Sequence, residues 1–202
     1  MYLFGARQKA VSFLKACNAR KVPVKLHIGC GANYKDGWIN MDYDRHAQRD
    51  MQVDVRQGIP FPDCSVDYIF NEHFIEHLSY EDGLAFMKEC YRVLKPMGVL
   101  RTAFPDMDTL IKAYQDDTWR NMEWVRLAKA EWFPSGCYML NTCIREGGGH
   151  LYMYTAPEMK RRLIEAGFGP DAIIQCDVRS SRHPELLNAE RRADSTVIEA
   201  TK

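Results

Sequence analysis

Three short segments of the chain carry residue types that suit binding of a nucleoside. Gly29-Cys30-Gly31 offers glycines, whose backbone adopts positive φ and lets a ligand approach closely. Asp42 can accept hydrogen bonds from both hydroxyls of a ribose, and Asp54 with Val55 offers an acceptor and an apolar wall to a purine. Each feature alone also fits an ordinary turn or a capped strand end. Their order and spacing together predict one site.

Histidines are the next candidates, because imidazole titrates near neutral pH and serves as a general base. His73 follows the fourth predicted strand, and His150 follows Gly147-Gly148-Gly149, a run of glycines that could act as a hinge. We treat both as candidate catalytic residues. The alternative for His150 is a solvated side chain in an exposed loop. His77, four residues after His73, is the third histidine of interest, and its simpler interpretation is a structural residue beneath the following helix.

Alternating strands and helices must position these residues. Strands are predicted at 24–28, 38–41, 52–55, 66–70, 98–104, 172–178 and 196–200. Helices are predicted at 3–19, 81–95, 107–117 and 156–166. This alternation predicts a mostly parallel sheet covered on both faces, with ligands at the carboxyl ends of the strands. The last two strands have no helix between them, which suggests an antiparallel addition at one edge.

Local signals fix the ends of several elements. Thr155 and Glu158 have the spacing of a capping box, and Gly167 supplies a left-handed helix end. Lys95-Pro96-Met97-Gly98 suits a type I turn, with proline second and glycine fourth, and a type I turn tolerates Met97 at its third position.

The N-terminal residues 1–22 contain an amphipathic helix, in which Ala10, Leu14 and Cys17 recur at helical spacing. We expect this helix to pack on the domain, with attachment to a membrane surface as the alternative. A run of about 18 apolar residues is absent, so no membrane span is expected. The first 17 residues make a poor signal peptide, and we expect a cytoplasmic protein.

Composition narrows the classes of partner. A chain of 202 residues fits a single domain, and its 46% hydrophobic and 27% charged residues are typical of a soluble globule. Lys plus Arg equals Asp plus Glu at 27 each, so the basic surplus of a nucleic-acid binder is missing. Seven cysteines without a CxxC pair favour reduced thiols over disulfides or a four-cysteine zinc site. No metal is expected.

Several motifs together resemble one family. The pattern LxxGCG…GWxNxD begins at Leu26 and ends at Asp42. It continues through Ile59–Asp67, Glu76-His77-Leu78, Arg92–Pro96, Pro105-Asp106 and Glu165–Phe168. Over residues 24–202 the chain resembles the class I S-adenosylmethionine-dependent methyltransferases, in particular small bacterial enzymes of methyltransferase type 11. The resemblance implies a three-layer αβα sandwich, a Rossmann-like fold whose seven-stranded sheet is mostly parallel with the last strand antiparallel.

The resemblance also implies roles for individual residues. The segment that passes the methionine part of S-adenosylmethionine corresponds to Gly29, Cys30 and Gly31. The ribose-binding acid corresponds to Asp42, and the residues that contact adenine correspond to Asp54 and Val55. The segment beside the transferable methyl corresponds to Asn71, Glu72 and His73. Three features depart from the family, and one is Met97, which replaces the more common glycine in the turn after Pro96. His27 replaces a common acidic residue, and only ten residues separate Gly31 from Asp42, so the loop must turn straight into the second strand.

Three other functions compete. A dinucleotide-binding dehydrogenase needs a third glycine and a helix after Gly31, and the short spacing leaves no room for them. His73-Phe74-Ile75-Glu76-His77 spells the H-x-x-E-H motif of zinc peptidases, but a distal third ligand cannot be identified. The third possibility is a non-catalytic module that binds the cofactor without turnover.

The acceptor is the least constrained part of the prediction. The resemblance implies O-methylation of a sugar or another small molecule, with S-adenosylhomocysteine as the product. Residues 107–154 lie between the fifth strand and the next helix, over the expected mouth of the site. They contain many aromatic residues, namely Tyr114, Trp119, Trp124, Trp132, Phe133 and Tyr138. We predict that this segment is a lid that contributes to acceptor choice. The sequence does not assign an oligomeric state.

Overall fold

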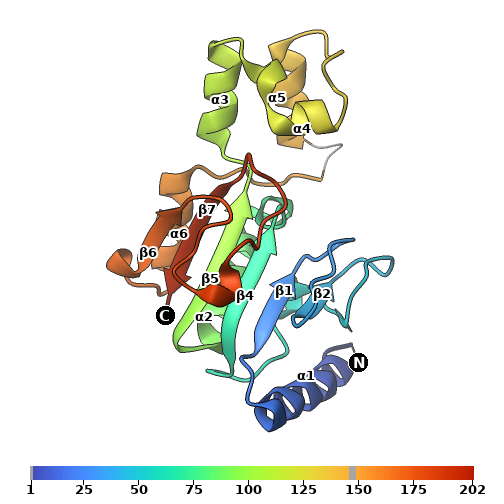
Figure 1. The fold of residues 1–202 in the computed structure, drawn as a ribbon, viewed down its shortest axis with the longest axis vertical. Coiled ribbons are helices and arrows are strands. Elements are labelled where there is room, and N and C mark those ends of the chain that lie inside the picture. The colour runs from blue at the N-terminus through green and yellow to red at the C-terminus, as the bar shows by residue number, and fades with distance from the viewer. Residues whose placement is uncertain (1, 146–148) are drawn as a thin grey trace.

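A seven-stranded sheet forms the centre of the computed structural model, which describes residues 2–145 and 149–202 (Figure 1). The strands are β1 (Lys25–Ile28), β2 (Ile39–Asp42), β3 (Met51–Gln52), β4 (Val66–Glu72), β5 (Leu94–Phe104), β6 (Ile173–Cys176) and β7 (Thr196–Thr201). Their order is β3-β2-β1-β4-β5-β7-β6. The five strands from β3 to β5 pair in parallel, whereas β7 pairs antiparallel to both of its neighbours. The predicted mostly parallel sheet with an antiparallel last strand is confirmed.

The last two strands pair antiparallel at one edge of the sheet, as predicted. β7 lies between β5 and β6, so β6 forms the edge. The helix α6 (Ala156–Glu165) connects β5 to β6, and a helical crossover of this kind places two strands in the same direction. Because the crossover leaves a gap beside β5, the chain returns through that gap as β7.

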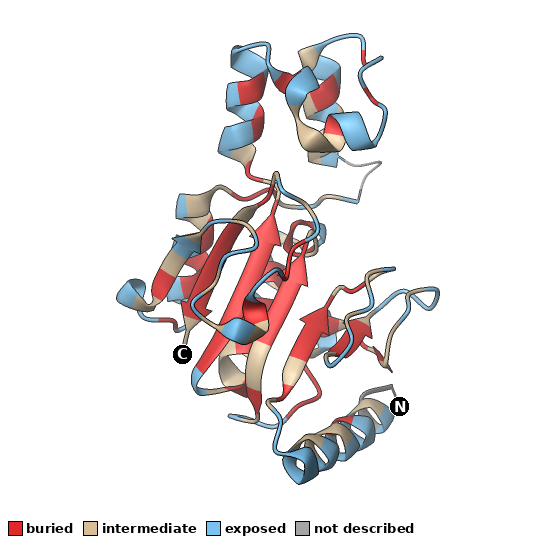
Figure 2. Cartoon of the chain, in the orientation of Figure 1, coloured by how far each residue is buried: buried red, intermediate tan, exposed pale blue. Residues whose placement is uncertain are grey.

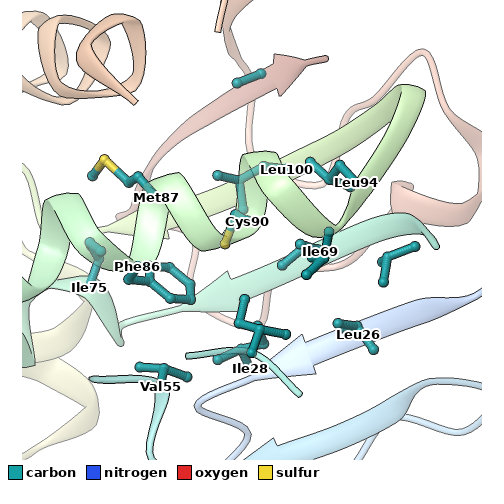
Figure 3. Packing of buried hydrophobic residues seen from close by; sticks show 14 of the residues in the cluster. Leu26, Ile28, Val55, Ile69, Ile75, Phe86, Met87, Cys90, Leu94 and Leu100 are labelled. Carbon is teal, nitrogen blue, oxygen red and sulfur yellow. The ribbon is translucent and has the colours of Figure 1, made fainter. Parts of the chain in front are cut away.

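One face of the sheet is packed by α2 (Tyr80–Val93) and α6. Phe86 and Cys90 point from α2 toward Ile69 of the sheet, and Leu26 and Leu100 lie in the same buried layer (Figure 3). Ser79 caps the first turn of α2 by accepting a hydrogen bond from Asp82 N. Burial of each large apolar side chain in this layer stabilises the fold by roughly 1.5–3 kcal/mol.

The opposite face of the sheet is covered by residues 177–195, which cross in front of β4 and β5 in Figure 1. Leu186 and Ala189 of this segment pack against Phe70 and Val99. Figure 2 shows that the central strands are buried under this cover. Sequence periodicity did not predict this segment, because it contains no regular element longer than the 3₁₀ turn Pro184–Leu186.

A buried ion cluster fastens the 177–195 segment to the sheet. Arg101 of β5 is fully buried and pairs with Glu190 of the segment and with Glu199 of β7, whose Oε1 lies 2.5 Å from Nη1. The same guanidinium donates to the carbonyl of Ser180 at 2.8 Å. Glu190, in the second half of this irregular segment, thus links the segment to Arg101 of the sheet.

The N-terminal helix α1 (Tyr2–Arg20) packs on the domain, as predicted. Ala10 is buried in the main core, and Leu14 and Cys17 pack against it. Over the described residues, none of the helices has both the length and the apolar content that crossing a bilayer requires.

Two local predictions are wrong. The third strand is Met51–Gln52 rather than 52–55, because Asp54 instead caps a 3₁₀ turn at Val55–Gln57. The type I turn at 95–98 is not formed, because Met97 has φ of +66°, and a positive φ at the third position is the mark of a type II turn. The Thr155 cap and the left-handed Gly167, with φ of +116°, are as predicted.

The segment between β5 and α6 folds as a small helical unit beyond the ends of the strands (Figure 1). It contains α3 (Met107–Gln115), α4 (Glu123–Leu127) and α5 (Gly136–Arg145). Its own core is formed by residues such as Leu110, Trp119, Val125, Phe133 and Met139. Asp106 caps α3 and forms an isolated bridge with Tyr154, so the two ends of the unit lie side by side.

Candidate functional site

The loops after β1 and β2 meet through the carboxylate of Asp42. Gly31 N donates to Asp42 Oδ2 at 2.7 Å, and Asp44 N donates to Asp42 Oδ1 at 2.8 Å. Residues 31–38 form turns rather than a helix, as the short spacing required. Each Asp42 oxygen retains a second lone pair, so the carboxylate can still accept hydrogen bonds from a ligand.

A cavity of about 250 Å³ lies at this edge of the sheet. Gly29, Asp42, Asp54 and Val55, which come from three separate loops, all line it. Their convergence is the geometry that the sequence predicted for a nucleoside site. The wall includes the apolar side chains of Ile28, Met41, Val53, Phe74, Leu78 and Leu151.

Asp54 is held by its own neighbour. Its two carboxylate oxygens each accept a hydrogen bond of 2.8 Å from the guanidinium of Arg56, and these bonds lower the pKa of Asp54. The carboxylate is therefore ionised and oriented. Val55 beside it is buried and supplies the apolar contact.

The backbone conformation and the packing at position 29 require glycine even without a ligand. The φ of Gly29 is +70°, and an added Cβ would lie 2.3 Å from the ring of Phe74. Gly31 also has positive φ, but an added Cβ there would meet open space. Cys30 is buried, its Sγ donates to the carbonyl of Gln48 at 3.3 Å, and burial raises the pKa of this thiol to about 12. Its thiol is therefore protonated and inert.

The side chains of Asn71 and Glu72 bond within the protein. The amide of Asn71 is buried in the sheet and accepts a hydrogen bond from Thr102 Oγ1 at 2.7 Å. Glu72 Oε1 accepts hydrogen bonds from the backbone N–H groups of Arg191 and Arg192. Neither side chain is among the described residues that line the 250 Å³ cavity.

His73 follows β4 directly with φ of +48°, and its side chain bonds to the same returning segment. Arg192 donates to its Nδ1 at 3.1 Å, so Nε2 carries the proton and donates to Ser195 Oγ at 3.0 Å. Burial, followed by the charge of Arg192, lowers the pKa of His73 to about 3. Both ring nitrogens of His73 are therefore engaged by residues 192–195.

A second cavity, of about 510 Å³, adjoins the first. His73, His77 and His150 form one wall, and the helical unit supplies Trp124 and Phe133 among others. His77 lines both cavities, so the two spaces meet at this imidazole. The remaining wall includes Pro105, Asp106, Thr109, Leu110, Met122, Leu127, Ala128, Thr142, Cys143, Arg192 and Asp194.

The structure decides against the simpler alternatives for two histidines. The side chain of His150 is 6% exposed, so it is not solvated. His77 is exposed to the cavities rather than buried beneath the following helix, and its ring packs edge-on against that of His150 with centroids 4.8 Å apart. Gly147 and Gly148 of the predicted hinge lie outside the described residues.

The competing motifs do not form the structures that they require. His73–His77 comprises two residues after β4 and the 3₁₀ turn Ile75–His77, whereas H-x-x-E-H peptidases need an α-helix. Sequence reasoning also missed contributors to the site. Phe74, Arg192 and Ser195 carry no pattern that marks them, because each acts through a contact made only in the folded chain.

Part of the chain is similar to known methyltransferases. A family described as "Methyltransferase domain" matches residues 27–102. A probable S-adenosylmethionine-dependent methyltransferase of Mycolicibacterium smegmatis is 37% identical over 110 residues, which is 46% of this chain and 41% of the relative. A protein of Mycobacterium tuberculosis with the same description is 36% identical over 110 residues, covering 46% of this chain and 38% of its own length. The chain therefore spans about two fifths of these relatives.

Solved structures agree on the fold. A S-adenosylmethionine-dependent methyltransferase of Archaeoglobus fulgidus aligns over 96% of this chain and 90% of its own, with a TM-score of 0.55 and 17% identity. Another from Methanosarcina mazei aligns over 89% and 92%, with a TM-score of 0.53 and 17% identity. Residues 27–102 thus match a methyltransferase family, and the chain has the fold of these solved methyltransferases.

Proposed function

We propose that this chain is an active methyltransferase that transfers the methyl group of S-adenosylmethionine to an oxygen of a small molecule or sugar. The observation that carries the proposal is the pair of cavities meeting at His77. The smaller one is lined by the glycine, carboxylate and apolar groups that suit an adenosyl ligand. The larger one would hold the acceptor. S-adenosylmethionine supplies a methyl group already activated on a sulfonium, so the protein's part is to align it and exclude water.

The residues of the smaller cavity fit the cofactor. Asp42 faces the cavity with its carboxylate anchored by two backbone N–H groups, so it is preorganised to accept ribose hydroxyls. Asp54 and Val55 lie on the same wall and suit adenine. We assign Gly29, Cys30 and Gly31 to the loop that shapes this wall. We assign Asn71 and Glu72 to positioning the chain after β4, since their side chains bond to Thr102 and to the backbone of residues 191–192.

The larger cavity favours a small acceptor. Its volume of about 510 Å³ falls in the range of small-molecule sites, roughly 300–1,000 Å³. Trp124 and Phe133 offer aromatic surfaces that can stack on a sugar ring or a flat ring. The formal net charge of zero does not favour a nucleic-acid acceptor. The seven free cysteines suit a reducing compartment, and we place the reaction in the cytoplasm.

A hydroxyl acceptor must lose its proton at the histidine wall of the larger cavity. Of the two histidines that we selected as catalytic, His73 already spends both ring nitrogens on Arg192 and Ser195. We therefore treat His73 as a positioning residue. His150, which faces the same cavity, is the one that acts on the acceptor.

Calorimetry with S-adenosylmethionine and with NAD, on the wild type and on Asp42→Asn, tests the cofactor site. We expect S-adenosylmethionine to bind and NAD to fail. Asp42→Asn keeps one acceptor oxygen, and loss of the other weakens binding by roughly 1–3 kcal/mol. Equal affinity of the wild type and the variant would exclude this ribose site. Binding without turnover of any acceptor would instead indicate a non-catalytic module.

The helical unit is proposed as the lid over the acceptor. Its ends lie together, because Met107 N donates to the carbonyl of Tyr154 at 2.9 Å, so residues 108–153 can be replaced by a short Gly-Ser linker. The deletion removes His150 and the aromatic wall of the larger cavity, so it is expected to abolish turnover. It removes only Leu151 from the smaller cavity, so the affinity for S-adenosylmethionine is expected to fall by less than the tenfold that 1.4 kcal/mol would cause. Normal turnover by the deletion variant would remove the lid hypothesis.

A further inference from the structure

Glu76, His77 and His150 form a cluster at the point where the two cavities meet. Each offers one ligand atom, and these atoms all lie within 4.8 Å of one another. Glu76 and His77 belong to the 3₁₀ turn after β4, whereas His150 comes from the far end of the helical unit. Glu76 is 1% exposed, which sets this group apart from acidic clusters on a surface.

The two imidazoles are oriented in the manner of metal ligands. His77 Nδ1 lies 3.0 Å from the carbonyl of Gly149, and His150 Nδ1 lies 2.6 Å from the carbonyl of Cys143. A carbonyl only accepts, so each Nδ1 carries a proton, and in the neutral ring the lone pair then lies on Nε2. A histidine that binds a metal commonly donates its other ring N–H to a carbonyl, which fixes the tautomer and the ring orientation.

Backbone contacts hold the three ligands in register. The carbonyl of Glu76 accepts hydrogen bonds from Leu151 N at 2.8 Å and from Tyr152 N at 3.2 Å, so the segment after His150 is fastened to the turn that carries Glu76. His150 Nε2 then lies 3.9 Å from Glu76 Oε1. His150 Nε2 and Glu76 Oε1 are therefore close enough to bind the same ion.

We propose that Glu76, His77 and His150 bind one divalent transition-metal ion, Zn²⁺ in the first place, at the wall of the acceptor cavity. Two imidazoles and one carboxylate are the ligand set of catalytic zinc sites, which keep a further position open. This departs from our expectation from sequence that the chain binds no metal. It also differs from the peptidase motif, because Glu76 replaces His73 as a ligand and His150 supplies the distal one.

The role of the ion rests on the proposed function. An acceptor hydroxyl in the open position would have its pKa lowered by the ion. Its O–H bond breaks, the electron pair stays on the oxygen, and the proton passes to water. His150 then acts on the acceptor through the ion rather than as a free base.

Metal titration of the full chain tests the site without any reference to activity. After treatment with a chelator and its removal, Co²⁺ is titrated while its visible absorption is followed, and Zn²⁺ is then added as a competitor. We expect one equivalent of Co²⁺ to bind and Zn²⁺ to displace it. His77→Ala and His150→Ala are expected to weaken binding by more than about 100-fold, beyond the usual cost of losing an outer-shell partner.

Two further variants make the titration decisive. His46→Ala removes an exposed histidine that does not belong to the cluster, and this variant is expected to bind Co²⁺ as the wild type does. His150→Cys replaces one zinc ligand by another and is expected to restore binding that His150→Ala loses. Thermal unfolding in the presence of chelator identifies variants that fail to fold. Absence of saturable binding to the wild type, or equal binding by well-folded His77→Ala and His150→Ala, overturns the site.

The failure of the metal site and the failure of the proposed function are distinguishable. Calorimetry with S-adenosylmethionine in chelator measures the cofactor site alone. Cofactor binding without metal binding would remove the ion and leave the methyltransferase, whereas metal binding without cofactor binding would do the reverse.

Discussion

The two cavities that meet at His77 are built in different ways. The cofactor cavity takes most of its wall from loops between β1 and the 3₁₀ turn at 55–57, and backbone hydrogen bonds to Asp42 join two of them. The acceptor cavity is assembled from the end of β4, the helical unit and residues 192–194. The first depends on local chain geometry, and the second depends on contacts between distant segments.

The two cavities also differ in how far the family match covers them. The family match at residues 27–102 includes the loops of the cofactor cavity but stops before the helical unit and the returning segment. The part of the site that this chain shares with known methyltransferases is therefore the locally built part. Most residues that line the larger cavity lie outside the matched segment.

The largest expected effect falls on the tether of the returning segment. Arg101→Met leaves Glu190 and Glu199 buried without their cation, and breaking a buried pair in this way costs roughly 3–5 kcal/mol. Urea unfolding measures the loss. In the exposed pair Lys112–Asp116 the control Lys112→Ala is expected to leave the free energy of unfolding unchanged within error.

Unfolding of Arg101→Met at the same urea concentration as the wild type would contradict the claim that the larger cavity depends on contacts between distant segments. The claim would be sharpened if the folded variant still bound S-adenosylmethionine but lost turnover. That result would separate the segment that carries Arg192 and Ser195 from the cofactor loops.

The pH dependence of stability tests the sheet beneath the cofactor loops. His27 is buried, donates from Nδ1 to Asn40 Oδ1 at 3.0 Å, and has its pKa lowered by burial from 6.5 to about 4. Between these values the unfolded chain binds more protons, so the stability is complete above pH 6.5 and falls as the pH drops toward 4. The loss attributable to His27 is about 3 kcal/mol.

Urea unfolding of the wild type and of His27→Gln at a series of pH values measures this contribution. The difference between the two is expected to shrink as the pH falls from 6.5 to 4. A constant difference over that range would mean that His27 does not titrate below its ordinary pKa.

Glycine substitutions compare two positions within the cofactor loop. Gly29→Ala forces a Cβ against the ring of Phe74 and retains a positive φ, so we expect a loss of about 2 kcal/mol from strain and overpacking. Gly31→Ala has the same backbone sign but open space around the added carbon, and about 1 kcal/mol is expected. Equal losses, measured by urea unfolding, would show that Phe74 does not press on Gly29.

The smallest effect is a gain. Met97 has φ of +66° and is 77% exposed, so it makes few contacts that would offset its backbone strain. Met97→Gly removes strain of about 1–2 kcal/mol and adds back part of it as chain entropy, for a net gain of about 0.5–1 kcal/mol. Met97→Ala retains the Cβ and is the control. A gain in both variants would point to the side chain rather than to φ.

The sequence was informative where the relevant residues are close together in the chain. Strand ends followed at once by glycine or aspartate placed Gly29, Asp42 and Asp54 at one sheet edge, and the structure brings all three to one cavity. The roles of Asn71 and Glu72 came from the resemblance alone, and no pattern in the sequence signals the contacts that their side chains make with Thr102 and with the backbone of Arg191.

The rest of the fold depends on pairings that have no local signal. The place of β7 inside the sheet follows from the crossover through α6, and the cover formed by residues 177–195 is held by Arg101 rather than by a periodic pattern. His150 was selected for its residue type, but its packing against His77 arises only when the helical unit folds back on the turn after β4.

A crystal structure with S-adenosylhomocysteine tests the central claim most directly. We predict that the ribose hydroxyls lie within hydrogen-bonding distance of the Asp42 carboxylate, with adenine against Val55 and the sulfur directed toward the cavity that His77 and His150 line. A nucleoside bound at another face of the sheet, or one whose sulfur points away from these histidines, would contradict both the cofactor site and the direction of methyl transfer.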